Sequence, residues 1–217
     1  MSSGDIRTEL AVAAARLIAE EGCEYAQAKR RAVQEIFGEG AERRTSMPDN
    51  SEVEHQLRRY LKLFGGESHR LLLRARRALA AEVMQTLREF DPYLIGAVLN
   101  GTATEHSDIH LELFVDSAKD VELQLMNLGI EFDVEAGGDA RPSVLERLSF
   151  VVKPVVNATA DSAVRPGFVG VQLHVYPRDA IRIARHRRNK PSETDLHPIE
   201  IAGRASLAAL TKLMASA

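Results

Sequence analysis

The stretch that most constrains this chain is residues 101–114, which begin Gly-Thr and end Ser-Asp-Ile-His-Leu-Glu-Leu-Phe. Its second half alternates polar and apolar residues, and successive side chains of a β-strand point to opposite faces of a sheet. We therefore predict a strand that carries Asp108, His110 and Glu112 on one face and its isoleucine and leucines on the other. Three side chains able to bind a cation would then lie close together.

The composition is that of a globular protein of moderate size. The chain has 217 residues, of which 45% are hydrophobic and 27% charged, which suits one large or two small domains. No run reaches the roughly 18 apolar residues that span a bilayer, so no membrane partner is expected. The first residues lack the apolar segment of a secretory signal, and the single Cys23 excludes an intrachain disulfide. These features predict a cytoplasmic protein.

Charge is distributed unevenly along the chain. Residues 1–90 hold 15 Lys and Arg against 14 Asp and Glu, residues 91–176 hold 5 against 13, and residues 177–217 hold 8 against 4. The central segment therefore has a net charge of −8, which opposes contact with a nucleic-acid backbone. Aromatic residues make up only 5% and tryptophan is absent, so no base-stacking platform is indicated. We expect no nucleic-acid partner.

Apolar residues recur at helical spacing through the first ninety residues. Glycines interrupt this pattern, and Pro92 ends it. The predicted helices are one that ends at Gly22, one over residues 25–37, one that begins at a Ser51–Glu54 capping box and ends at residues 65–66, and one over residues 67–90.

Beyond Pro92 the pattern changes to short β-branched and apolar runs. The predicted strands cover residues 93–99, 108–115, 130–134, 148–155 and 168–176; the predicted helices cover residues 117–128, capped by Ser117, and 203–214; the predicted loops cover residues 137–142, 157–167 and 185–198. Helices followed by strands predict an α+β protein. We divide it into an N-terminal helical region, residues 1–90, and an α/β domain with a mixed sheet and flanking helices, residues 91–217.

The Gly101-Thr102 turn, the Ser107-Asp108 pair and the strand after them resemble the nucleotidyltransferase superfamily, which has the polymerase-beta-like fold. In that family a Gly-Ser turn follows the first strand, and the second strand reads Ser-Asp-Ile-Asp-Leu. Its two aspartates bind divalent metal together with a third carboxylate on a later strand, which is two-metal chemistry. The resemblance covers residues 93–177 and extends to small bacterial proteins grouped with this superfamily. It implies a nucleotidyltransferase-like sheet.

Carried over by position, the resemblance implies a set of site residues. The candidates for binding a nucleotide are Gly101, Thr102 and Ser107. The catalytic candidates are Asp108, His110 and Glu112. His110 stands where the family has its second aspartate, and the strand over residues 171–175 carries Gln172 and His174 where a carboxylate is expected.

These replacements change which ion the site prefers. Mg²⁺ favours oxygen ligands, whereas imidazole nitrogen favours softer transition metals. If the two strands are neighbours, Asp108, His110 and His174 could form a His/carboxylate metal site. The implied cofactor is a divalent metal ion, Mg²⁺ or Mn²⁺, with Zn²⁺ as a further option.

Each candidate also has a purely structural interpretation. Asp108 could cap the turn before the strand, His110 could be a hydrogen-bonded sheet histidine, and Glu112 could lie on a solvated face. We expect Arg204 to be a surface or ion-pair residue. The basic cluster of residues 182–190 could be a solvated loop or a contact for a phosphate or an acidic ligand.

Three functions follow from these observations. The first is a divergent nucleotidyltransferase-fold protein with degenerate or lost transferase activity that binds a nucleotide or a metal. The second is an active metal-dependent nucleotidyltransferase that acts on a hydroxyl of a small molecule or protein. The third is a His/carboxylate metalloprotein of other activity. The missing second and third aspartates favour the first. The expected partners are a nucleotide and, through the N-terminal helices, a second copy or another protein.

Overall fold

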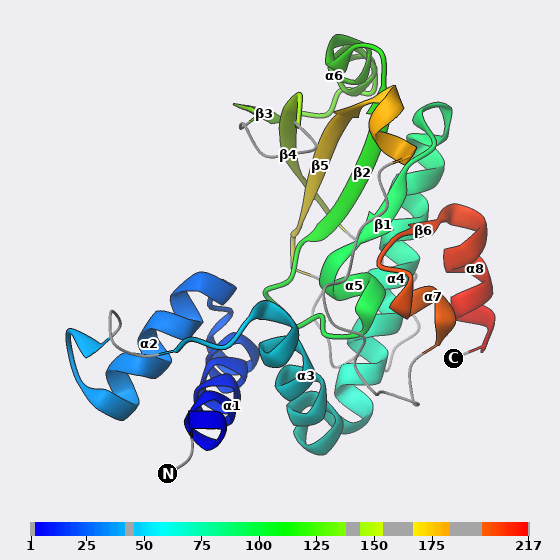
Figure 1. Ribbon diagram of the computed structural model, residues 1–217. Coiled ribbons are helices and arrows are strands. Elements are labelled where there is room, and N and C mark those ends of the chain that lie inside the picture. Colours follow the sequence, from blue (N-terminus) through cyan, green and yellow to red (C-terminus); the bar gives the residue numbers. More distant parts are fainter. Residues whose placement is uncertain (1–2, 42–45, 138–143, 154–166, 183–196, 217) are drawn as a thin grey trace. The chain divides into compact units, whose positions relative to one another are not determined.

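The structure is a computed structural model that describes residues 3–41, 46–137, 144–153, 167–182 and 197–216. It confirms the α+β class (Figure 1). The elements in chain order are α1 (Ser3–Glu21), α2 (Tyr25–Phe37), α3 (Asn50–Tyr60), η2 (Leu61–Gly65), α4 (Gly66–Thr86), η3 (Arg88–Phe90), β1 (Tyr93–Ile95), α5 (Gly96–Asn100), β2 (Ile109–Val115), α6 (Ala118–Asn127), β3 (Asp133–Ala136), β4 (Glu146–Val152), β5 (Val169–Pro177), η4 (Arg178–Arg182), α7 (Pro198–Ile201), β6 (Ala205–Ser206) and α8 (Leu207–Ser216).

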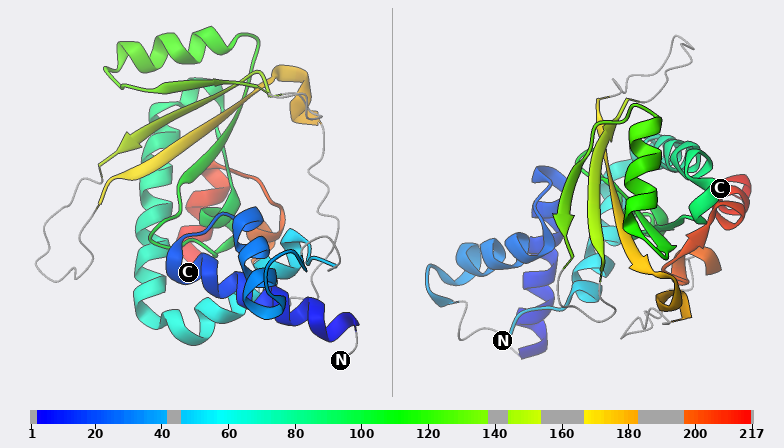
Figure 2. Two further views of the ribbon diagram at one scale, coloured as in Figure 1. Left: turned by 90° about the vertical axis from the view of Figure 1, so that its left-hand side faces the viewer. Right: turned by 90° about the horizontal axis from the view of Figure 1, so that it is seen from above.

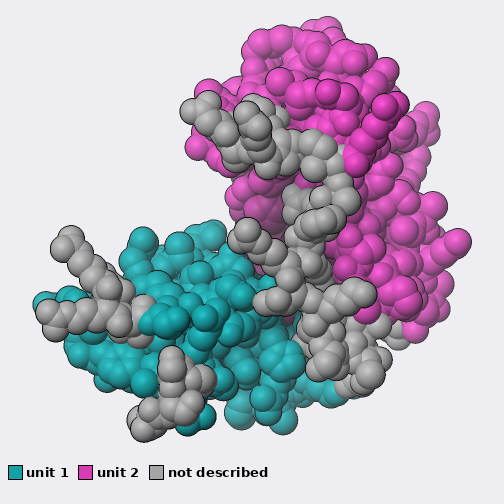
Figure 3. Space-filling view, in the orientation of Figure 1, with its two compact units in different colours: residues 1–71, 104–106, 188–194 teal, residues 72–103, 107–187, 195–217 magenta. Residues whose placement is uncertain are grey.

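The chain forms two compact units, which Figure 3 shows in different colours. The first consists mainly of residues 1–71, and the second contains the sheet with the rest of α4. The division falls between Leu71 and Leu72, inside α4, whereas the sequence places its boundary after residue 90.

The first unit is built around helices α1, α2 and α3, which share one small apolar core. Leu10 and Leu17 of α1, Val33 of α2 and Leu57 of α3 are almost completely buried there. The predicted helix over residues 25–37 is confirmed, as is the end of the first helix at Gly22. Gly22 has φ +69°, and a Cβ atom there would lie 2.5 Å from the Cγ atom of His106, so the position requires glycine.

The third helix has its N-cap two residues earlier than predicted. Asp49, not Ser51, is the N-cap: its carboxylate accepts from the Glu52 N–H at 2.9 Å, and its own N–H donates to Glu52 at 2.7 Å. The Ser51–Glu54 prediction is therefore wrong, because two overlapping boxes compete and Asp caps as well as Ser. Arg7 of α1 donates to the same Glu52 carboxylate at 2.7 Å, which favours this register.

The sequence predicts that the third helix ends at the glycine pair of residues 65–66, whereas the α-helix ends at Tyr60. Residues 61–65 instead form a turn of π-helix, and α4 starts at Gly66, which has φ +51°. The chain therefore bends while remaining helical.

The second unit contains a six-stranded sheet in the order β3-β4-β5-β2-β1-β6. Strands β2 and β5 are parallel, and every other neighbouring pair is antiparallel. The alternation predicted for β2 is confirmed, since Ile109, Leu111 and Leu113 lie in the main core with residues of α4, α6 and α8. Figure 2 shows α4 and α6 on the same side of the sheet. The polar residues of β2 therefore lie on the opposite face.

Three predicted elements of this unit are wrong in extent. The run over residues 93–99 is a strand only as far as Ile95 and then becomes α5, because Gly96 has φ +72° and breaks the extended backbone. The strand predicted at residues 130–134 starts at Asp133, and the last helix starts at Leu207, after β6. Periodicity alone separates short buried strands from helices poorly.

Two further predictions have clear outcomes. Ser117 is the N-cap of α6 and accepts from the Lys119 N–H at 3.2 Å, as predicted. The strands predicted at residues 148–155 and 168–176 correspond to β4 and β5. The loops predicted at residues 137–142, 157–167 and 185–198, with most of the basic cluster, lie largely outside the described residues.

The two competing capping boxes give a direct test. Asp49→Ala should lower the free energy of unfolding of the first unit by about 1 kcal/mol, because it leaves a helix N–H without its side-chain acceptor. Ser51→Ala is the matched control, expected within about 0.5 kcal/mol of the parent protein. Denaturant unfolding monitored by circular dichroism measures both. A larger loss for Ser51→Ala would contradict the observed register.

Candidate functional site

Strands β2 and β5 are direct parallel neighbours, which brings the predicted site strands together. His110 is in register with Gln172, and Glu112 with His174. Residues paired in this way point to the same face of a sheet. The predicted His/carboxylate site requires that these two strands be neighbours, and they are.

The imidazoles of His110 and His174 are in direct contact. The Nδ1 atom of His110 lies 3.2 Å from the Nε2 atom of His174. The rings are 22° from parallel, and their centroids are 5.5 Å apart. This distance is about the sum of the 3.2 Å between the two nitrogens and the radii of the two rings. The two nitrogens consequently lie close to the line joining the ring centres and share one hydrogen atom when both rings are neutral. Both histidines are half-buried.

Asp108 lies at the start of the same polar face and is held by β5. Gln172 donates to its Oδ2 atom at 2.9 Å. The carboxylate lies directly over Gly170, where a Cβ atom would be only 2.3 Å from Oδ1. Glycine at this position therefore makes room for Asp108. The amide of Gln172 therefore orients the Asp108 carboxylate.

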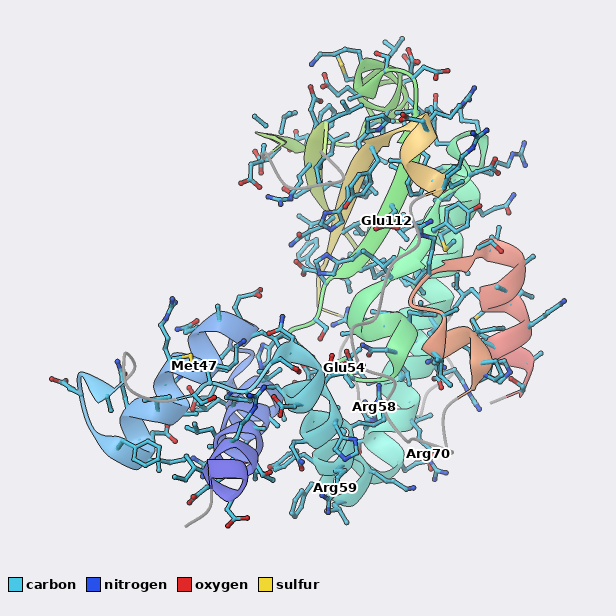
Figure 4. The ribbon with its side chains drawn as sticks, in the orientation of Figure 1. Met47, Glu54, Arg58, Arg59, Arg70 and Glu112 are labelled. Atoms are coloured by element: carbon cyan, nitrogen blue, oxygen red, sulfur yellow. The ribbon has the colours of Figure 1, made fainter. Side chains whose placement is uncertain are left out.

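Glu112 is buried and carries its own counterion. Its side chain is 2% exposed, and the Arg204 Nε atom donates to Oε2 at 2.8 Å. The guanidinium of Arg204 also lies over Phe114, 4.8 Å from the ring centroid, and within 5.7 Å of the Tyr93 centroid. Figure 4 labels Glu112 in the middle of the sheet. Arg204 is thus an ion-pair residue, as predicted, and Glu112 does not lie on a solvated face.

The Gly101-Thr102 turn is satisfied by its own chain. The Thr102 hydroxyl donates to the Asn100 side chain at 2.7 Å, and the Thr102 N–H donates to the same oxygen at 3.1 Å. Thr102 is only 1% exposed. Its hydroxyl therefore closes a local turn instead of facing a cavity.

A buried ion pair lies behind this turn. Arg77 of α4 donates to the Val98 and Leu99 carbonyls, which end helix α5, and to Glu200 at 2.6 Å. The position of a Cβ atom on Gly101 would be 3.5 Å from that Glu200 carboxylate. Arg77 and Glu200 thus close one side of the turn that the resemblance assigns to a phosphate.

The structure brings some of the predicted residues together and separates others. His110 contacts His174, whereas Asp108 is bonded to Gln172 and Glu112 to Arg204. Ser107 is half-buried beside Asp108. Within the described part of the chain, no three His, Cys, Asp or Glu residues form a ready-made metal site.

The sequence did not assign partners to these side chains. The role of Gln172 as a donor to Asp108 could have been inferred from its place in the later strand. The Arg204 and Glu200 contacts span more than ninety residues, and no local pattern signals them.

Comparison with known proteins adds no assignment. No protein-family model, curated protein or solved structure matches the chain. Of the helices in the described ranges, none is long and apolar enough to cross a membrane.

The buried Glu112–Arg204 pair predicts a large asymmetry between single and double variants. Arg204→Met should destabilise the second unit by about 3 kcal/mol, because it leaves a buried carboxylate without a counterion. Glu112→Gln combined with Arg204→Met should recover much of that loss, since an uncharged amide costs less to bury. Lys212→Met, at an exposed position of α8, is the control for removing a positive charge. Equal stability of the Arg204→Met and Lys212→Met variants would contradict the pairing.

Proposed function

We propose that this protein binds one divalent transition-metal ion through His110 and His174 on a nucleotidyltransferase-like sheet, and that it does not transfer nucleotides. The supporting observation is the 3.2 Å separation of the two imidazole nitrogens on neighbouring strands. The half-buried setting limits competition from water at this position.

The separation suits a shared ion. In a tetrahedral zinc site, two nitrogens at about 2.05 Å from the metal lie about 3.3 Å apart. The two rings presently face one another, so each would rotate by about 35° to aim its nitrogen at a shared tetrahedral ion. The donor ring would then carry its proton on its other nitrogen. Imidazole ligands favour zinc and its transition-metal neighbours over magnesium. The donor set therefore fits a single borderline ion better than a pair of Mg²⁺ ions.

Asp108 is the carboxylate that we assign to the same ion. It precedes His110 by two residues, and its contact Gln172 is in register with His110. Gln172 would act on the metal indirectly by orienting this carboxylate, as residues behind metal ligands commonly do. When bound, the ion would supply Lewis acidity or structural cross-linking to the sheet face.

Several contacts argue against nucleotidyl transfer. The family's second carboxylate position is occupied here by His110, and the candidates for the third, Gln172 and His174, are not carboxylates either. Glu112 is neutralised by Arg204, and the Thr102 hydroxyl is bonded to Asn100. Two-metal chemistry needs several carboxylate oxygens around both ions, and Asp108 alone among these positions supplies them. These observations support the hypothesis of lost transferase activity.

Metal binding is tested on tag-free protein. Titration calorimetry with Zn²⁺, Mn²⁺ and Mg²⁺, together with elemental analysis, should show one equivalent of Zn²⁺ and negligible Mg²⁺. His110→Ala and His174→Ala should each weaken Zn²⁺ binding more than about tenfold, and Gln172→Leu by about tenfold. His55→Ala, in helix α3 of the first unit, is the control for adventitious histidine binding. Affinity should fall as the pH is lowered, because protons compete with the metal ion for imidazole nitrogen.

The same preparations separate the alternatives. Folded protein that takes up no transition metal would rule out the proposed site. Binding of nucleoside triphosphate with Mg²⁺ that is unchanged in His110→Ala would favour a nucleotide sensor. Transfer of a nucleoside monophosphate that requires Asp108 would instead support the active enzyme.

A further inference from the structure

The bend between α3 and α4 exposes apolar side chains. Leu63 and Phe64, in the π-helical turn, are each 72% exposed, and Leu71 of α4 is about half exposed. The ring of Phe64 rests against Tyr60, with centroids 4.7 Å apart, so it is held outward by an aromatic neighbour. π-Helical turns are uncommon in proteins, and those that occur often lie at functional sites.

The bend is also basic. Residues 58–71 contain four Lys or Arg and one acidic residue, Glu67. Arg59, Lys62 and Arg70 are exposed there, and Figure 4 labels Arg58, Arg59 and Arg70 along this part of the chain. Arg58 and Arg70 pair with Glu54 and Glu67, so Arg59 and Lys62 supply the net positive charge beside the apolar tip.

A second segment has the opposite character. Residues 118–136, which form α6, the following turn and β3, contain five acidic residues and one lysine. Its exposed large apolar residues are Leu123, Met126, Leu128 and Val134. Glu131 and Asp133 are exposed as well. This acidic segment lies in the second unit, whereas the basic bend lies in the first.

We propose that the basic bend of one copy docks on the acidic segment of a second copy of this chain. Each surface combines exposed apolar side chains with a net charge, and the two net charges are opposite in sign. Apolar contact would supply most of the affinity, and charge complementarity would set the partner and speed the encounter. Because the two surfaces differ, each single contact is heterologous, and such contacts build closed rings or open filaments.

Other partners are less well supported by these observations. An anionic lipid surface would attract the bend but be repelled by the acidic segment, whose exposed apolar residues would stay uncovered. Nucleic acid would likewise use only the bend. Association between copies of this chain uses both surfaces.

Charge reversal tests the pairing directly. Sedimentation of the wild-type chain across a range of concentrations should show self-association that weakens as salt rises. Arg59→Glu with Lys62→Glu should weaken it at least about tenfold, and so should Glu131→Lys with Asp133→Lys. The four substitutions combined should restore association, because they exchange the two signs. An equimolar mixture of the two double variants should form a mixed complex.

The apolar part has its own matched control. Leu63→Ser with Phe64→Ser should weaken association, whereas Phe168→Ser should not, although Phe168 is 74% exposed outside both segments. These side chains are exposed, so circular dichroism melting should show all variants folded.

Three results would overturn the proposal. They are a wild-type chain that stays monomeric, charge reversals without effect, and failure of the four-substitution variant to recover. A monomer that sediments with vesicles of phosphatidylcholine and phosphatidylserine, but not of phosphatidylcholine alone, would assign the bend to lipid instead.

Discussion

The parallel pairing of β2 with β5 is the constraint on which the rest of the second unit depends. One face of this pair is apolar and packs on α4, α6 and α8. A shift of register by one residue would move every polar side chain of β2 into that core. The burial of the leucines therefore fixes where the histidines lie. The imidazole contact is a consequence of core packing, with no local signal that specifies it.

The polar groups of this face are mostly satisfied from within the chain. Glu112 has Arg204, Asp108 has Gln172, and the two histidines have each other. Buried polar groups are costly unless they are paired, so these contacts also stabilise the fold. The histidine pair differs from the charged pairs, because neutral imidazoles can bind a metal ion without breaking an ion pair, and the donor ring can carry its proton on its other nitrogen. This difference is why the proposed site lies there.

Local pattern was enough to predict much of the fold. The helix over residues 25–37, the cap at Ser117 and the faces of β2 all follow from spacing and residue type within a few positions. Predictions failed where two local solutions compete. The capping box forms at Asp49 and not at the predicted Ser51, because Arg7, which is distant in sequence, binds Glu52 of the Asp49 box. The run after Pro92 changed from strand to helix at Gly96, whose backbone conformation no periodicity reveals.

The candidate site was predictable in its residues but not in their partners. Alternation identified Asp108, His110 and Glu112, and the resemblance identified the later strand with His174. Whether a carboxylate is available to a ligand depends on what reaches it from elsewhere in the chain. Arg204 reaches Glu112 across 92 residues of sequence, and that single ion pair removes Glu112 from the set of readily available metal ligands. A motif therefore records which side chains share a face, whereas the long-range contacts decide which of them can still bind something else.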